Sequence, residues 1–234
     1  MIFLQQKRLA RRILTHHSLI FASCAVFLVL LYYSLPQQDA IWKLSFVTAY
    51  AALILLTITL LIGPWNTLRG HRNPVSSDLR RDVGIWAALL GMAHTIIGLD
   101  VHLRGRPWLY FIYPRHEAHW IPLRHDLFGF ANDTGLLGTL ILLLLFATSN
   151  DLSLRCLGTP RWKSLQRWNY ALFFLVALHG AAYQTIETQK RSFVAALVLC
   201  VALTILMQTL GFHLRRQSEN PAAQTNAKRC RNKV

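Results

Sequence analysis

The sequence predicts an all-α membrane protein, a six-transmembrane-helix bundle with its N- and C-termini in the cytoplasm. Three observations lead to this fold class. Hydrophobic residues make up 53% of the 234 residues. Apolar stretches long enough to cross a hydrocarbon core of about 30 Å recur along the whole chain, and basic residues gather in alternate connections between them. Because no connection is long enough to build a core of its own, we expect one membrane domain.

The first expected span follows a basic cytoplasmic tail, residues 1–17. The stretch "LIFASCAVFLVLLYY" after "MIFLQQKRLARR" could belong to a signal peptide. However, no small-residue cleavage site follows, and five more apolar segments do, so we interpret it as a membrane helix. The polar C-terminal tail, residues 213–234, is expected to be disordered. The expected spans are Ser18–Leu35, Leu44–Ile62, Val83–Val101, Ala131–Ser149, Trp168–Ile186 and Phe193–Phe212.

The distribution of lysine and arginine predicts the orientation. Eighteen of the 25 basic residues lie in the two tails and in the connections before the third and fifth spans. Basic loops stay in the cytoplasm, so both termini are expected there. The alternation of basic and less basic connections also supports six spans. The net charge of +15 then fits an inner face that contacts anionic membrane lipid, and no nucleic-acid partner is expected.

The longest connection, residues 103–130, is expected outside, with its aromatic residues along the headgroup level. It carries His116, His119 and His125. These side chains could bind an external metal or substrate, although H-x-x-H spacing is a weak signal. After this connection, Asp133 is expected to cap the fourth span, because carboxylates are favourable at a helix N-terminus.

Only two of the ten histidines are expected deep in the membrane. His94 lies thirteen residues after Arg81, His179 lies twelve residues after Arg167, and both helices start from the cytoplasmic side. At about 1.5 Å per residue, both imidazoles lie roughly 18–20 Å from the inner boundary. Polar side chains at such a depth are costly and usually functional. Two imidazoles at one depth can bind both axial positions of a heme iron.

The glycines beside His94 fit the same interpretation. Gly91, His94 and Gly98 share one helical face, where the missing side chains would let a flat macrocycle approach the backbone. The alternative is that each histidine hydrogen-bonds across helices and that the glycines serve close helix packing. A metal site without porphyrin is less favoured, because no deep Cys, Asp or Glu offers a third ligand. We therefore predict a heme bound by His94 and His179.

Two stretches resemble a known family. "NPVSSDLRRDVGIWAALLGMAH" is similar to the start of the third helix of ferric reductase-like transmembrane domains. "RWKSLQRWNYALFFLVALHG" is similar to their fifth helix, close to the form found in heme-binding subunits of bacterial methionine sulfoxide reductases. The resemblance covers roughly residues 44–212. It implies a bundle, in a bacterial inner membrane, that passes electrons through b-type heme, with His94 and His179 as the matching iron ligands.

The sequence also departs from this family. Members with two hemes have a second histidine about thirteen or fourteen residues earlier on each helix. Here those positions hold Arg80 or Arg81 and Gln166. Because arginine stays protonated and offers no lone pair, we expect one heme.

A flavin or nicotinamide domain is not expected, since none follows the sixth span and no GxGxxG motif occurs. Electrons must then come from a separate donor, a membrane quinol or a flavoprotein. They would pass to an external reductase partner or to a metal substrate. The resulting hypothesis is a membrane cytochrome b, and its classification as an enzyme stays open. The alternative is a heme-free membrane scaffold or transporter-like subunit that keeps the bundle only as architecture.

Overall fold

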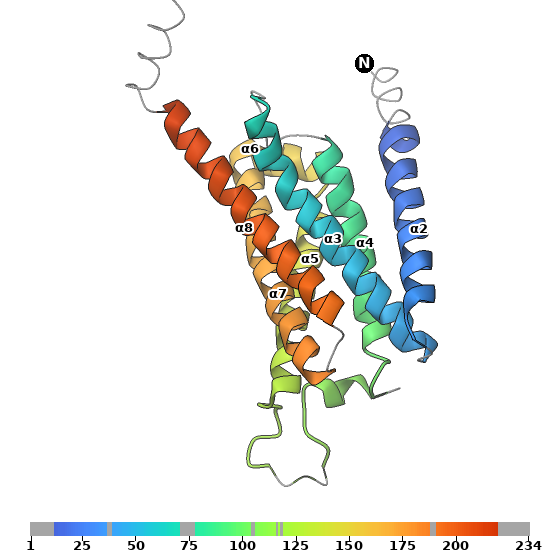
Figure 1. Ribbon diagram of the computed structural model, residues 1–234. Coiled ribbons are helices and arrows are strands. Elements are labelled where there is room, and N and C mark those ends of the chain that lie inside the picture. Colours follow the sequence, from blue (N-terminus) through green and yellow to red (C-terminus); the bar gives the residue numbers. More distant parts are fainter. Residues whose placement is uncertain are drawn as a thin grey trace, which may run out of the picture.

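The computed structural model describes residues 12–36, 39–70, 78–103, 106–115, 117, 119–187 and 191–219. The all-helical prediction is confirmed for these residues, which contain no β-structure beyond one isolated bridge, between Ile112 and Leu123. The long helices run side by side, and both ends of the described chain lie at the same end of the bundle (Figure 1). We call this the terminal end, and we call the opposite end the hairpin end.

The first half of the bundle consists of three long helices. They are α2 (Ser18–Ser34), α3 (Ala40–Leu68) and α4 (Asp78–Gly98). A π-helical turn, η1 (Ile13–His17), leads into α2, so the described part of the predicted N-terminal tail continues the first helix. α4 begins five residues before the predicted span, with Asp78 in its first turn, where a carboxylate stabilises the N-terminal end of the helix dipole.

The second half contains α5 (Leu127–Ala147), α6 (Asp151–Gln166), α7 (Trp168–Ile186) and α8 (Arg191–Glu219). The bounds of α7 match the predicted fifth span at both ends. α8 extends beyond the predicted sixth span through residue 219. The first part of the tail expected to be disordered is therefore helical, and residues 220–234 lie outside the described residues.

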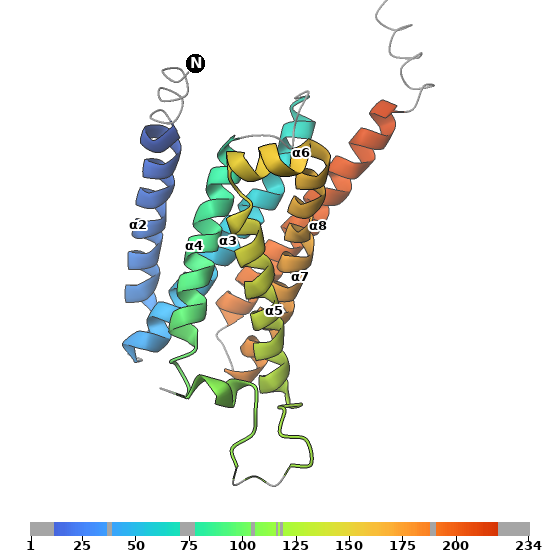
Figure 2. The ribbon, with the colours of Figure 1, turned by 180° about the vertical axis from the view of Figure 1, so that it is seen from behind.

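α6 replaces the connection expected between the fourth and fifth spans. The Asn150 side chain caps it by accepting a hydrogen bond of 2.7 Å from the Ser153 backbone N–H. The helix is broken at Gly158, where φ is +71°, a left-handed conformation that glycine adopts without a steric penalty. α6 lies across the terminal end of the bundle (Figure 2), so this connection is a polar helix rather than an open loop.

α5 begins four residues earlier than expected, and Asp133 does not cap it. The cap is Asp126, whose Oδ1 accepts a 2.7 Å hydrogen bond from the Gly129 backbone N–H. Asp126 also bonds Arg124, with Nη1 2.8 Å from Oδ2. Asp133 is an exposed residue in the second turn. The prediction was wrong because Asp126, about two turns earlier, accepts from a free backbone N–H at the actual start of the helix.

Among the described residues, four helices are long and apolar enough to cross a membrane, as expected of an integral membrane protein. They are Leu14–Ser34, α3, α5 and Arg191–Gln217 of α8. The two remaining long helices, α4 and α7, carry the deep histidines and are more polar. α4 starts with the charged stretch "DLRRD", and α7 contains Asn169 and Gln184 besides its histidine.

A solid apolar core fills the half of the bundle nearer to the terminal end. Its members come from α3, α4, α5, α7 and α8 and include Leu60, Leu145, Leu172 and Phe173. α3 packs against α4 and α8, while α5 packs against α7. In the hairpin half, α4 and α7 therefore face each other across an interior that these packed pairs enclose.

A buried carboxylate attaches the N-terminal segment to this bundle. Asp82 of α4 has no exposed surface, and its carboxylate accepts hydrogen bonds from the Arg12 guanidinium. His16 Nδ1 lies 2.8 Å from Oδ2, and His17 Nε2 lies 3.5 Å from Oδ1. The Trp86 indole N–H also donates to His17, at 3.2 Å. We call this group the Asp82 cluster; it fixes the start of α2 to α4.

Candidate functional site

A cavity of about 470 Å³ lies in the hairpin half of the bundle, between α3, α4, α5 and α7. At one end it stops at core residues such as Leu56, Ala87 and Leu172. At the other end it reaches Trp108, in the short helix η2 (Pro107–Tyr110). Its size falls within the range of small-molecule and cofactor pockets. Both deep histidines line it.

His94 and His179 face each other inside this cavity. Their ring centroids lie 6.0 Å apart, with an interplanar angle of 74°. An imidazole nitrogen binds a metal ion at about 2 Å and lies roughly 1 Å from its own ring centroid, so two rings on opposite sides of one ion have centroids about 6 Å apart. The separation therefore fits two axial ligands of a single iron.

The hydrogen bonds of both rings determine which nitrogen is free. His94 Nδ1 lies 2.9 Å from the Ser45 carbonyl oxygen of α3, and 3.2 Å from the Ser45 hydroxyl. His179 Nδ1 lies 2.8 Å from the Ala131 carbonyl oxygen of α5. A carbonyl only accepts, so each neutral ring carries its proton on Nδ1 and keeps a lone pair on Nε2. This arrangement is typical of metal-binding histidines, whose second nitrogen donates to a backbone carbonyl.

Gly135 of α5 makes room for the His179 ring. A Cβ atom at this position would lie 2.7 Å from His179 Nδ1 and 2.9 Å from its Cε1, closer than real Cβ contacts allow. Only glycine is therefore compatible with the observed ring position. Sequence reasoning did not select this residue, because Gly135 lies on a different helix from both histidines and nothing in its local sequence indicates the contact.

The two glycines predicted to flank a cofactor have different surroundings. Gly98 lines the cavity, and a Cβ there would lie 3.8 Å from His94 Cε1. Gly91 is not among the residues that line the cavity. A Cβ at Gly91 would lie 2.9 Å from Leu142 of α5 and 4.0 Å from Ala52 of α3. In this structure Gly91 therefore serves close packing between helices.

The cavity wall near the hairpin end contains polar side chains, which sequence reasoning also missed. His102 Nε2 lies 2.9 Å from Glu187 Oε1, and the Trp42 indole N–H donates to Glu187 Oε2 at 3.0 Å. The bonds from His102 and Trp42 keep the pKa of Glu187 below its ordinary value, despite partial burial that opposes this shift. All three side chains line the cavity, so an ionised carboxylate lies near its hairpin end.

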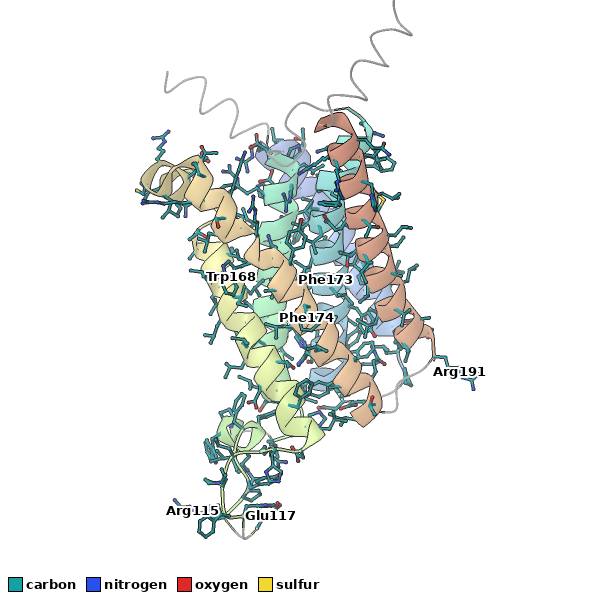
Figure 3. All side chains as sticks on the ribbon, turned by 90° about the vertical axis from the view of Figure 1, so that its left-hand side faces the viewer. Arg115, Glu117, Trp168, Phe173, Phe174 and Arg191 are labelled. Atoms are coloured by element: carbon teal, nitrogen blue, oxygen red, sulfur yellow. The ribbon has the colours of Figure 1, made fainter. Side chains whose placement is uncertain are left out.

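A hairpin protrudes from the bundle, with Arg115 and Glu117 near its tip (Figure 3). Two of the predicted external histidines, His119 and His125, belong to this segment, which the bridge between Ile112 and Leu123 closes. The rings of His119 and His125 are 5.7 Å apart, and Tyr113 stacks on His119 at 3.7 Å. His116 lies outside the described residues. Within the described part of the chain, no group of three or more His, Cys, Asp or Glu side chains could hold a metal ion.

No family model matches this chain. Two imidazole rings lie 6.0 Å apart in one cavity, each with its Nε2 lone pair left by the Nδ1 hydrogen bond, and a glycine and two backbone carbonyls fix their orientation. These residues fit a planar metal cofactor bound axially from both sides.

Proposed function

We propose that this chain is a membrane b-type cytochrome that passes electrons, through one heme bound by His94 and His179, to an acceptor at the outer face. One observation carries the proposal. The two imidazoles have a centroid separation of 6.0 Å, and both Nδ1 atoms are bound to backbone carbonyls. Histidines that only tied helices together would not need to lie beside each other, whereas here both rings line one cavity and each keeps a lone pair on Nε2.

A heme at this position would supply a one-electron carrier, and the surrounding residues would determine its properties. The carbonyls of Ser45 and Ala131 hold both rings in the tautomer that binds iron. Bis-histidine ligation, hydrogen bonding to the ligands and burial all tune a heme potential. Thr95 and Thr139 bond each other at 3.0 Å and line the same cavity, so their hydroxyl groups are already satisfied.

A single heme is favoured by what lies nearer to the terminal end. Arg80 Nε donates to the Thr59 carbonyl oxygen at 3.1 Å, and Gln166 Nε2 lies 3.5 Å from the Thr148 hydroxyl. The space between these helices holds the buried side chains of Leu60, Leu145 and Phe173. These contacts support the inference from the sequence that a second heme has neither ligands nor room.

The proposal includes six membrane spans with both termini in the cytoplasm. α4 and α7 have 21 and 19 residues, about 32 and 29 Å at 1.5 Å per residue, which suits a hydrocarbon core of about 30 Å. Their lower hydropathy comes from the charged start of α4 and from polar side chains that line the cavity, such as His94, His179 and Gln184. An even number of spans agrees with both chain ends lying at one end of the bundle (Figure 1).

In this arrangement the donor is a separate component, a membrane quinol or a flavoprotein. The acceptor, an external reductase partner or a metal, would approach the hairpin end. A bacterial inner membrane and membership of the ferric reductase-like family belong to the same proposal, and the motifs around His94 and His179 support them.

Spectroscopy of the purified protein, expressed with heme supplied, tests the proposal. We expect a Soret band that sharpens and shifts on reduction with dithionite. His94→Ala and His179→Ala should abolish six-coordinate heme, while His125→Ala, in the hairpin, should leave the spectrum unchanged. Expression must be measured beside each spectrum, because an unpartnered buried imidazole also destabilises the fold. A colourless wild type, or full six-coordinate heme in both single variants, would refute the proposal and favour the heme-free scaffold.

A further inference from the structure

A continuous series of ring contacts joins the imidazole pair to the hairpin end. The ring of Tyr183 lies 4.9 Å from that of His179. The ring of His102 stacks on Tyr183 at 6.2 Å, with an interplanar angle of 14°. His102 in turn bonds Glu187 at 2.9 Å. The centroids of His179 and His102 are therefore no more than about 11 Å apart, and an imidazole–carboxylate pair shares the cavity with the proposed iron ligands.

We propose that His102 takes up a proton from the hairpin-end solvent each time the site between His94 and His179 gains an electron, with Glu187 as the fixed counter-charge. This inference rests on the proposed function. An added electron places one negative charge in an apolar enclosure, where it attracts a proton to the nearest available base. At an effective dielectric constant of about 20, one charge at about 11 Å raises the proton affinity of a base by roughly tenfold.

The hydrogen bonds show which atom would accept the proton. In neutral His102, Nε2–H donates to Glu187 Oε1, so the lone pair is on Nδ1. Glu187 stays ionised because His102 and Trp42 occupy both of its oxygens. The balance is one electron from the separate donor to the site and one proton from water to Nδ1 of His102. When the electron leaves for the acceptor, the proton returns to water.

The other groups that face the pair do not compete for this proton. The Tyr183 hydroxyl donates to Asn132 at 2.8 Å. The Tyr110 hydroxyl donates to the Gly98 carbonyl at 3.0 Å, and burial raises the pKa of Tyr110, with Asp100 adding to the shift. Both phenols therefore stay protonated near neutral pH. Arg191, at the start of α8, projects away from the bundle (Figure 3).

Potentiometric titration of the heme-loaded protein tests the inference. The midpoint potential of the wild type should fall as the pH rises, because a proton accompanies the electron. A tenfold coupling corresponds to a total fall of about 59 mV for a one-electron couple. His102→Gln should remove this dependence. Glu187→Gln should move it to lower pH, because the imidazolium loses its counter-charge. Glu117→Gln, in the hairpin, is the matched carboxylate control and should behave as the wild type.

The outcomes separate the two proposals. If the wild type binds no heme, both fail. If it binds heme but His102→Gln keeps the wild-type pH dependence, or the wild type shows none, the proton inference alone is overturned. If His102→Gln does not accumulate, Glu187→Gln decides, because an unchanged dependence in that variant equally refutes a role for the pair.

Discussion

Replacing Gly135 with alanine should disrupt the candidate site although both proposed ligands, His94 and His179, are still present. The new Cβ would lie 2.7 Å from His179 Nδ1, whereas ordinary contacts begin at 3.4 Å. The ring must therefore shift by about 0.7 Å, and metal–ligand distances tolerate only about 0.2 Å. Overpacking of this kind costs about 1–3 kcal/mol. If that cost falls on the bound state, heme affinity drops roughly 5- to 150-fold.

Gly138→Ala is the matched control for this substitution. Gly138 lies on the same helix, three residues on, and also lines the cavity, but a Cβ there would lie 3.7 Å from Leu172 and 3.8 Å from Leu175, both ordinary contacts. Heme titration and low-temperature electron paramagnetic resonance of both variants provide the readout. The Gly135→Ala spectrum should show altered or lost bis-histidine ligation, and the Gly138→Ala spectrum should not. Equal heme affinity and identical spectra would refute the steric reasoning.

Three further predictions concern stoichiometry, the Asp82 cluster and pH. A pyridine hemochrome assay should give about one heme per chain, and a value near two would contradict the argument from Arg80 and Gln166. Asp82→Asn should destabilise the protein by about 3–5 kcal/mol, because Arg12 loses a fully buried partner. Asp151→Asn, at the exposed pair with Arg81, should cost less than about 1 kcal/mol. Equal melting temperatures of the two variants in detergent would contradict this contrast. Because the pKa of Glu187 is lowered in the folded protein, its contribution to stability is complete above the unfolded-state pKa of about 4.3 and declines as the pH falls below that pKa. Thermal melts between about pH 5 and 3 should therefore show a steeper loss of stability in the wild type than in Glu187→Gln.

The sequence predicted those features that local pattern determines. Apolar length and the recurrence of basic connections predicted the helices, and α7 was placed at its observed bounds. Counting residues from the basic connections placed His94 and His179 at one depth, and their rings face each other in the structure. Both inferences depend only on the constant rise per residue of a helix.

The parts that could not be predicted depend on contacts between distant segments. Gly135 matters only because α5 packs against α7 beside His179. Likewise, Glu187 and His102 come together from the ends of different helices, 85 positions apart in the chain. The Asp133 prediction failed for a local reason, since two aspartates stood near the start of α5 and only the geometry of the turn selects Asp126. Pairwise contacts of this kind leave no trace in hydropathy or charge distribution.

The Asp82 cluster has a consequence for how the protein is assembled. α2 is synthesised before α4 and has little buried surface of its own, with Cys24 its one buried side chain among the described residues. Arg12, His16 and His17 therefore remain without this carboxylate until the ribosome has produced α4. Closure of the cluster then joins an earlier part of the chain to a later one, and under the proposed six-span topology a chain in which α4 is misinserted would leave Asp82 and Arg12 on opposite sides of the membrane. Under that topology the cluster makes the correct insertion of α4 a condition for retaining α2 in the bundle.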